Sequence, residues 1–500
     1  MKKVKLGKGD IFTMELKKLL NGLEKVKAKG NVDIDIKKIE NDSRKIEPGT
    51  LFVAVKGFEV DGHQFVNQAI EKGATAIMVE EGIDVKSIPL KDETTLLVVP
   101  DTRYALAIMA CNFYGNPSKK FKLVGITGTK GKTTTSYMMK ALLEKQGQKV
   151  GLIGTIATYI GEKKIKDNER TTPDSLELQQ LFAKMAEEKV DTVIMEVSSQ
   201  SLKLNRVAGS YFDIGVFTNF SEDHISEKEH PDMEDYFQAK VKLFTMCKTG
   251  FVNADDLYAV KIKKLVPNCD IKTYGIDNYC DLLAKDVTIT NIGSDFKVKL
   301  GNKNERVKVC IPGRFSVYNS LAAICVALKL GVKPENIVSG LLEVRVPGRS
   351  ELVPNKKDLA IMIDYAHSPE SLESILKAVK SYTTGRVISL FGCGGDRDKS
   401  KRPIMGEISG EIADFTIITS DNPRTEVPEE IIKEIENGMK KTKGKYICIV
   451  DRKEAIQYAI QMANRKDIIV LAGKGHEPYQ EINGKKYPFD ERIIVNEIIK

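Results

Sequence analysis

The sequence predicts an α/β protein of three domains: a mixed α/β domain at the N-terminus, a central domain built on a parallel sheet, and a Rossmann-like C-terminal domain. Two stretches, from residue 121 to about 250 and from 359 to 472, alternate apolar runs with helical patterns, which is typical of parallel sheets covered by helices. The length of 500 residues fits several domains of ~150 residues each. We expect the domains at residues 1–115, 116–347 and 348–500.

The N-terminal domain mixes short strands with helices. Apolar runs at Leu51–Val55 and Ala76–Val79 predict strands, and Gln64–Lys72 and Tyr104–Tyr114 predict helices. Residues 115–120 are rich in turn formers and predict a linker to the next domain.

The central domain opens on a glycine-rich loop, Gly128-Thr-Lys-Gly-Lys-Thr-Thr134, between an apolar run and a helical pattern at Ser136–Lys145. Such a loop lets the backbone approach a phosphate, and the N–H groups at the helix start favour an anion. Lys132 supplies a positive charge and Thr133 a hydroxyl for Mg²⁺. The longer P-loop pattern has a glycine where Ile126 stands, so the match is to the short G-x-x-G-K-T form. The loop predicts a central sheet like that of P-loop ATPases.

Two further strands of this domain end in polar groups. Asp191–Glu196 ends in a carboxylate, and Ile214–Asn219 is followed closely by His224. Because ligands bind beyond the carboxyl ends of strands in open α/β sheets, we expect Thr133, Glu196 and His224 to converge beside a triphosphate and to hold Mg²⁺.

The rest of the chain completes the pattern. Residues 250–309 are lysine-rich and predict irregular structure, 313–331 predicts a helix, and a turn at 346–349 ends the domain. The C-terminal domain has five predicted strands: Leu359–Ile363, Val387–Phe391, Phe415–Thr419, Tyr446–Val450 and Ile468–Ala472.

The composition indicates which kinds of molecule the protein binds and in which cellular compartment we expect it. The net charge of +8 is spread along the chain and suits small anionic substrates, and no basic run interleaved with aromatic residues predicts nucleic-acid binding. The first residues lack the apolar stretch of a signal peptide, and no apolar run nears the ~18 residues of a membrane span. The eight cysteines are scattered without a C-x-x-C pair. We expect a cytoplasmic monomer without a membrane span.

Five sequence motifs together resemble the Mur ligase family, and within it the tripeptide-synthetase branch. They are Gly128–Thr134, Thr171-Thr-Pro-Asp174, Met195-Glu-Val-Ser-Ser199, Thr218-Asn-Phe-Ser-Glu-Asp-His224 and Tyr236-Phe-Gln-Ala-Lys-Val-Lys-Leu-Phe244. The resemblance extends from Asp42-Ser-Arg44 to Gly473-Lys-Gly-His-Glu477. It implies three domains, ATP, Mg²⁺ and amide-bond formation on a peptidoglycan precursor by way of an acyl phosphate.

The resemblance also implies roles for single residues. Lys132, Lys240, Glu196 and His224 would be catalytic, and Lys240 would carry a carbamate that adds a fourth metal ligand to Thr133, Glu196 and His224. Without the family, the helix position of Lys240 predicts an ordinary solvated lysine. The expected ATP contacts are Gly128, Thr129, Lys130, Gly131, Lys132, Thr133, Thr134, Asn319, Arg349 and Asp364. The expected contacts to the UDP-linked precursor are Ser43, His63, Gln64, Thr171, Thr172, Ser198 and Arg206.

The C-terminal strands predict an amino-acid site along one sheet edge. Its expected residues are Arg397, Asp421, Asn422, Pro423, Arg424, Gly473 and Glu477. Arg424 and Arg397 suit a carboxylate, and Glu477 suits an ammonium. Meso-diaminopimelate carries both groups at each end, whereas L-lysine lacks the distal carboxylate and would leave Arg424 unpaired.

The sequence leaves alternatives open. The same ligase could add L-lysine or another diamino acid. Remoter hypotheses are a folylpolyglutamate synthetase-like ligase, a non-catalytic nucleotide-binding regulator and a P-loop kinase. Gln200, where many family members have His, and the segment from Ile225 to Pro231 depart from the family pattern near the dipeptide and metal sites.

Overall fold

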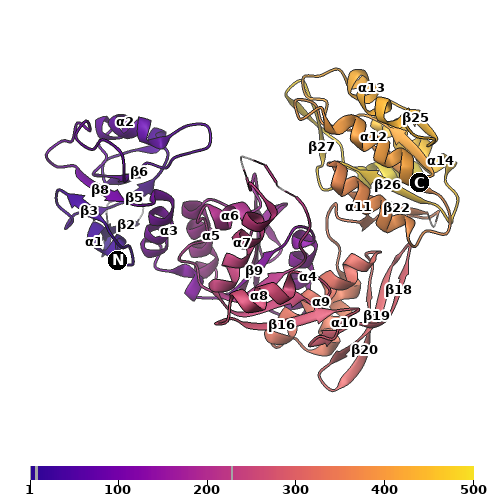
Figure 1. The fold of residues 1–500 in the computed structure, drawn as a ribbon, viewed down its shortest axis with the longest axis horizontal. Coiled ribbons are helices and arrows are strands. Elements are labelled where there is room, and N and C mark those ends of the chain that lie inside the picture. The colour runs from indigo at the N-terminus through magenta and orange to yellow at the C-terminus, as the bar shows by residue number, and fades with distance from the viewer. Residues whose placement is uncertain (1, 6–9, 224, 227–228, 358) are drawn as a thin grey trace. The chain divides into compact units, whose positions relative to one another are not determined.

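The computed structural model describes residues 2–5, 10–223, 225–226, 229–357 and 359–500 (Figure 1). The chain forms two compact units. The first unit consists of Met1–Ser136 and Gly147–Thr273, and the second consists of Tyr137–Gln146 and Tyr274–Lys500. Each unit is described by itself below.

The N-terminal part of the first unit is a five-stranded sheet in the order β3-β8-β7-β6-β5. Strands β5 to β8 pair in parallel, and β3 pairs with β8 in antiparallel fashion. The predicted helix at 64–72 instead begins as a 3-10 turn at Gly62–Phe65 and becomes α-helical at Val66. The elements are β1 (Lys2–Lys5), β2 (Asp10–Glu15), α1 (Leu16–Leu19), β3 (Lys27–Lys29), β4 (Asp35–Ile36), β5 (Lys38–Glu40), β6 (Thr50–Val53), α2 (Val66–Glu71), β7 (Ala76–Glu80), β8 (Thr95–Val99) and α3 (Thr102–Phe113).

The central part of the first unit is a sheet in the order β12-β11-β10-β13-β9-β14-β15-β16. Strands β10, β13, β9, β14 and β15 are parallel, as predicted, whereas β11 and β12 add an antiparallel edge that the sequence did not predict. The elements are β9 (Lys122–Thr127), β10 (Val150–Ile153), β11 (Ala157–Ile160), β12 (Lys163–Asp167), α5 (Ser175–Glu187), β13 (Thr192–Glu196), α6 (Ser199–Lys203), β14 (Phe212–Phe217), α7 (Met233–Thr245), β15 (Cys247–Asn253), α8 (Ala259–Leu265) and β16 (Asp270–Gly275).

The prediction of irregular structure at 250–309 is wrong. In the second unit, β18 (Lys285–Thr290), β19 (Gly293–Leu300) and β20 (Lys303–Val309) form an antiparallel sheet after the short β17 (Leu282–Leu283). Strand β19 alternates exposed and buried positions, so its lysines face water while Phe296 and Val298 are buried. The lysine-rich composition therefore marks the solvent face of a sheet rather than a loop. Helices α9 (Arg314–Lys329) and α10 (Pro334–Glu343) follow.

The C-terminal part of the second unit is a six-stranded sheet in the order β21-β22-β26-β23-β24-β25, parallel except for β21. Alternate residues face two apolar cores: Met362 joins one, with Leu372 of α11, and Ile361 the other, with Ile456 of α14. The elements are β21 (Glu351–Leu352), β22 (Ala360–Asp364), α11 (Pro369–Lys380), β23 (Val387–Phe391), α12 (Lys401–Ile412), β24 (Phe415–Ile418), α13 (Pro428–Met439), β25 (Tyr446–Cys448), α14 (Arg452–Met462), β26 (Ile468–Ala472), β27 (Tyr479–Ile482), β28 (Lys485–Pro488) and α15 (Glu491–Ile499). All five strands predicted here are present.

Within the part of the chain that the structure describes, the helices are all too short or too polar to cross a lipid bilayer.

Candidate active site

The glycine-rich loop connects β9 to α4 (Lys132–Lys145), so the helix begins at Lys132 rather than at Ser136 as the sequence predicted. Gly128 and Gly131 have φ angles of +138° and +86°, and a Cβ on Gly128 would lie 2.0 Å from the Thr218 hydroxyl oxygen. Both positions therefore require glycine. The earlier start places Lys132 and Thr133 in the first helical turn, where backbone N–H groups have no partner within the helix.

The Lys132 side chain contacts the backbone of its own loop. Its Nζ donates to the carbonyl oxygens of Gly128 at 2.8 Å and Thr129 at 2.9 Å. The loop is also tied to the end of β14, because the Lys130 N–H donates to the Asn219 side chain and the Thr129 N–H to the Asn219 carbonyl. The charge thus sits inside the loop, where an anion bound by the loop backbone would meet it.

Thr133 and Glu196 meet, as the sequence predicted. The Thr133 hydroxyl donates to Glu196 Oε2 at 2.9 Å, and both side chains are buried. Thr155 completes the surroundings, donating from its hydroxyl at 3.0 Å to Oε2 and from its N–H at 3.0 Å to Oε1. A Cβ on Gly154 would lie 2.2 Å from Glu196 Oε1, so this neighbour also has to be glycine. Thr155 is a site residue that sequence reasoning missed.

Lys240 is buried rather than solvated, so the prediction from its helix position alone is wrong. It lies on α7, is 1% exposed, and its Nζ donates to the Gly128 carbonyl at 2.9 Å. Burial holds the pKa of Lys240 well below its ordinary value, and the nearby Lys132 ammonium acts in the same direction. A lowered pKa favours the neutral amine, which is the form that reacts with carbon dioxide, so Lys240 beside the phosphate loop is chemically suited to carbamylation. The remaining predicted metal ligand, His224, lies outside the described residues.

His230 belongs to the segment that departs from the family pattern, and it is fully buried. Its Nδ1 lies 2.6 Å from Asp235 Oδ2 and its Nε2 lies 2.9 Å from the Ser199 hydroxyl oxygen. Burial is the main cause that lowers its pKa, while the hydrogen bond to Asp235 opposes the shift. His230 thus joins α6 to α7.

The predicted precursor contacts form two sets within the first unit. Ser43 donates to Gln68 at 2.7 Å. His63 uses both ring nitrogens, with Nδ1 at 2.6 Å from Asp61 and Nε2 accepting from the Glu80 N–H at 3.1 Å. Gln64 is exposed.

The second set surrounds the end of β13. The Thr172 hydroxyl donates to the Glu196 carbonyl at 2.9 Å and accepts from the Ser198 N–H at 3.1 Å. Arg206 donates to the Thr172 carbonyl at 3.2 Å, and the Thr171 hydroxyl lies 3.1 Å from that of Thr155. These four predicted residues therefore share one network with Glu196.

Three predicted ATP contacts belong to the second unit. Asn319 is buried on α9. Asp364 ends β22 and accepts from the Ser350 N–H at 2.7 Å, and burial raises its pKa against the opposing charge of Arg349. The Arg349 guanidinium stacks over Tyr365, 4.9 Å from the ring centroid.

The predicted amino-acid residues follow β23, β24 and β26, at one edge of the C-terminal sheet. The Asn422 amide donates to Glu477 Oε2 at 2.8 Å, and its oxygen accepts from the buried Lys474 Nζ at 3.0 Å. Gly473 has φ +112°, and a Cβ there would lie 2.6 Å from Asp421 Oδ2, a buried oxygen without a hydrogen-bond partner among the described residues. Burial raises the pKa of Glu477 and lowers that of Lys474. Arg397 is exposed.

Arg424 has partners that the sequence did not predict. Its Nη1 donates to the Gly395 carbonyl at 2.6 Å, and its Nε lies 3.3 Å from Glu481 Oε2. The argument that a substrate without a distal carboxylate leaves Arg424 unpaired is therefore wrong. Sequence reasoning missed Lys474, Glu481 and the hairpin of β27 and β28, although Asn483-Gly484 between two short alternating runs is a strong hairpin signal.

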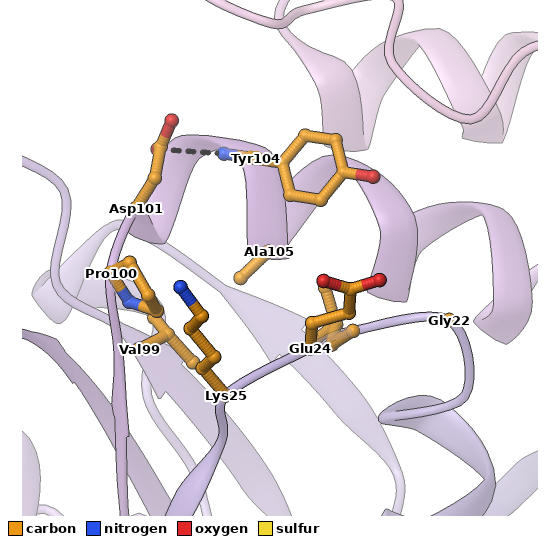
Figure 2. Close-up of a pocket in the computed structure, with 9 residues that line it drawn as sticks. Gly22, Glu24, Lys25, Val99, Pro100, Asp101, Tyr104 and Ala105 are labelled. Atoms are coloured by element: carbon orange, nitrogen blue, oxygen red, sulfur yellow. Dashed lines mark hydrogen bonds between the residues drawn. The ribbon is translucent and has the colours of Figure 1, made fainter.

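A separate cavity of about 350 Å³ lies in the N-terminal domain (Figure 2). It is bounded by Glu24 and Lys25 before β3 and by Asp101 and Tyr104 at the start of α3. None of the predicted site residues lines it.

A phosphate-binding loop at the carboxyl edge of a parallel sheet, with a buried carboxylate on the next strand, defines an α/β nucleotide-binding protein. Three family models match the chain: the Mur ligase family catalytic domain over residues 35–114, the Mur ligase middle domain over 126–327, and the Mur ligase glutamate ligase domain over 348–475. The chain belongs to the Mur ligase family, which confirms the resemblance seen in the sequence. The predicted boundaries at 115 and 347 stay predictions.

Close relatives are similar over nearly the whole chain. The UDP-N-acetylmuramoyl-L-alanyl-D-glutamate–2,6-diaminopimelate ligase 1 of Clostridium acetobutylicum is 47% identical, over 97% of this chain and 99% of that protein. The corresponding ligase of Caldanaerobacter subterraneus subsp. tengcongensis is 48% identical over 97% and 99%. A solved structure of a UDP-N-acetylmuramoyl-L-alanyl-D-glutamate–2,6-diaminopimelate ligase superposes with a TM-score of 0.71 and 30% identity, covering 98% of this chain and 99% of the other.

Proposed function

We propose that this chain is an ATP-dependent amide ligase that adds meso-diaminopimelate to UDP-N-acetylmuramoyl-L-alanyl-D-glutamate in peptidoglycan precursor synthesis. The observation that carries the proposal is the phosphate loop whose Thr133 hydroxyl meets the buried Glu196 carboxylate at 2.9 Å. Relatives named for this reaction, 47% and 48% identical over nearly full length, support the choice of substrates.

In the first step, a carboxylate oxygen of the precursor attacks the γ-phosphorus of ATP. An O–P bond forms as the bond to the β–γ bridging oxygen breaks, which gives an acyl phosphate and ADP. Lys132 and the N–H groups at the start of α4 stabilise the negative charge of the transferring group. Asn319, Arg349 and Asp364 are proposed to hold the nucleotide.

The residues around Glu196 fit Mg²⁺. Thr133 and Glu196 present neighbouring buried oxygens, the atoms that Mg²⁺ prefers, and a carbamate on Lys240 would add another. His224 stays a proposed ligand. When bound, the ion neutralises charge on the phosphates. The carbamate forms when the neutral Lys240 amine attacks carbon dioxide and loses a proton, a reaction that the lowered pKa of Lys240 favours.

In the second step, a neutral amine of the amino acid attacks the acyl carbon and the bond to the phosphate oxygen breaks. Inorganic phosphate leaves, the nitrogen loses one proton to solvent, and an amide remains. Asp421 and Glu477 offer oxygens for an ammonium, and Asn422 holds Glu477 through its amide N–H. Arg424 offers a guanidinium for the distal carboxylate. The residues around Thr172, with Ser43, His63 and Gln64, are proposed to hold the precursor. Because the substrates are ATP and a nucleotide-linked sugar, the proposed place of action is the cytoplasm, and the proposed form is a monomer.

The test is ATP-dependent phosphate release with the precursor and, separately, meso-diaminopimelate, L-lysine or L-ornithine. We expect release only with meso-diaminopimelate. Release with L-lysine would keep the ligase and overturn the choice of amino acid. A phosphorylated product would indicate a kinase. Phosphate release with a folate substrate would indicate a folylpolyglutamate synthetase, and no phosphate release with any of the substrates would indicate a nucleotide-binding regulator.

A further inference from the structure

The Arg424 guanidinium already has a carboxylate beside its Nε, and one of its terminal nitrogens donates to the backbone. Nε, on the side-on edge, forms the ion pair with Glu481 at 3.3 Å. Nη1 donates to the Gly395 carbonyl at 2.6 Å. A carboxylate held by two parallel hydrogen bonds needs both donors of one edge. A substrate carboxylate bound to Nε and its neighbouring terminal nitrogen would therefore take the position beside Nε where Glu481 Oε2 lies.

The backbone fixes the position of Glu481. Its N–H donates to the Asn422 side chain at 2.9 Å, and its carbonyl accepts from the Arg424 N–H at 3.0 Å. The Asn483 N–H in turn donates to the Arg424 carbonyl at 2.7 Å, and Gln480 donates to the Asp421 carbonyl at 2.7 Å. Residues 480–483 of the hairpin are thus joined to the loop 421–424 by several hydrogen bonds, which fix the backbone of Glu481 beside Arg424.

The pair is neither deeply buried nor freely solvated. The side chains of Arg424 and Glu481 are 23% and 25% exposed. An ion pair in such a position is weak enough to exchange partners, yet strong enough to compete with an incoming carboxylate. The Gly395 carbonyl is neutral and does not compete in the same way.

We propose that Glu481 is an internal counter-ion that competes with the distal carboxylate of the amino acid for Arg424, and so determines how strongly that carboxylate is selected. The inference rests on the proposed function, because it takes Arg424 as the carboxylate clamp. With meso-diaminopimelate, the substrate carboxylate takes the side-on edge and Glu481 turns to solvent. With L-lysine, Arg424 keeps Glu481, so the missing carboxylate costs less than it would beside an unpaired arginine.

The test compares the wild-type enzyme with Glu481→Gln, which keeps the backbone contacts and the side-chain size but removes the charge. We expect the KM for meso-diaminopimelate to fall roughly three- to tenfold, with kcat changed by less than about twofold. Any activity with L-lysine should fall, since Arg424 then lacks a counter-ion. Glu430→Gln, an exposed position on α13, is the matched control and should change neither value.

A second comparison separates competition from general damage. In an Arg424→Ala background, Glu481→Gln should leave the KM for meso-diaminopimelate unchanged. An equal shift in that background, or an unchanged or raised KM in the single variant, overturns the role of Glu481 and leaves the proposed function standing. A wild-type enzyme that adds L-lysine and not meso-diaminopimelate overturns both.

Discussion

The phosphate loop and the amino-acid edge are built in different ways. In the loop, Gly128, Thr129, Lys132 and Thr133 lie within six consecutive residues, and Lys132 is held by carbonyls three and four residues before it. The amino-acid edge is assembled from three separate segments: 392–397, 421–424 and 473–483. A site made by one local turn can be recognised from spacing, whereas a site made from several strand ends depends on how the sheet brings them together.

The two regions should also respond differently to substitution. Loop groups are ordered by the turn and by the start of α4, so single substitutions there remove one role at a time. At the amino-acid edge the groups hold one another, as Lys474, Glu477 and Glu481 all contact Asn422. We expect variants there to be non-additive, with effects confined to the amino acid.

The largest expected effect lies in the loop. Lys132→Ala should lower kcat for ATP-dependent phosphate release by about 1,000-fold, because the transferring phosphoryl group loses its positive partner. Steady-state kinetics measures this, and circular dichroism checks the fold. A loss below about tenfold would contradict the assignment of Lys132 to the phosphate.

Lys240→Met should lower kcat by about 100-fold, because the proposed carbamate ligand cannot form. The same variant should be more stable than wild type near neutral pH, measured by urea unfolding in buffer free of carbon dioxide. Since burial lowers the pKa of Lys240 in the folded state, the unfolded chain binds more protons between the folded pKa and the ordinary lysine value. The wild-type free energy of unfolding therefore rises with pH across that window, and this component should be absent from the variant. A slope of equal size in both proteins would show that Lys240 is not the group responsible.

Arg424→Ala tests the assembled site. The KM for meso-diaminopimelate should rise by roughly 50-fold, because the distal carboxylate of the substrate loses its partly buried arginine partner. The KM for ATP should stay unchanged. Competition between meso-diaminopimelate and L-lysine in one assay measures the change in preference. A rise in both KM values would mean that the two regions are not independent.

Gly484→Val is expected to have the smallest effect. Asn483 and Gly484 have φ angles of +49° and +72°, and a β-branched residue is strained in that region, so the hairpin should be destabilised by about 1 to 3 kcal/mol. The KM for meso-diaminopimelate should rise a few fold, since the hairpin holds Asn422 and Arg424. Asn496→Ala on the exposed face of α15 is the control, and hydrogen exchange of residues 479–488 measures the loosening.

The sequence predicted the elements of the C-terminal sheet well because its strands are short apolar runs bounded by turn formers. It failed at 250–309, where the lysines of β19 alternate with buried residues and were taken for irregular structure. It also failed for the environment of Lys240. A helix position identifies the residue but does not say which side of the helix meets the phosphate loop.

The sequence by itself determined the Mur ligase family, the phosphate loop and the five predicted strands of the C-terminal sheet, because these depend on local motifs, spacing and periodicity. The sequence predicted that Thr133 and Glu196 converge. Only the tertiary structure decided that they share a direct hydrogen bond, that Lys240 is buried and that Arg424 already has Glu481 as a partner. These contacts join residues 57 to 112 positions apart. Their geometry follows from sheet order and side-chain packing, which no single stretch of the chain encodes.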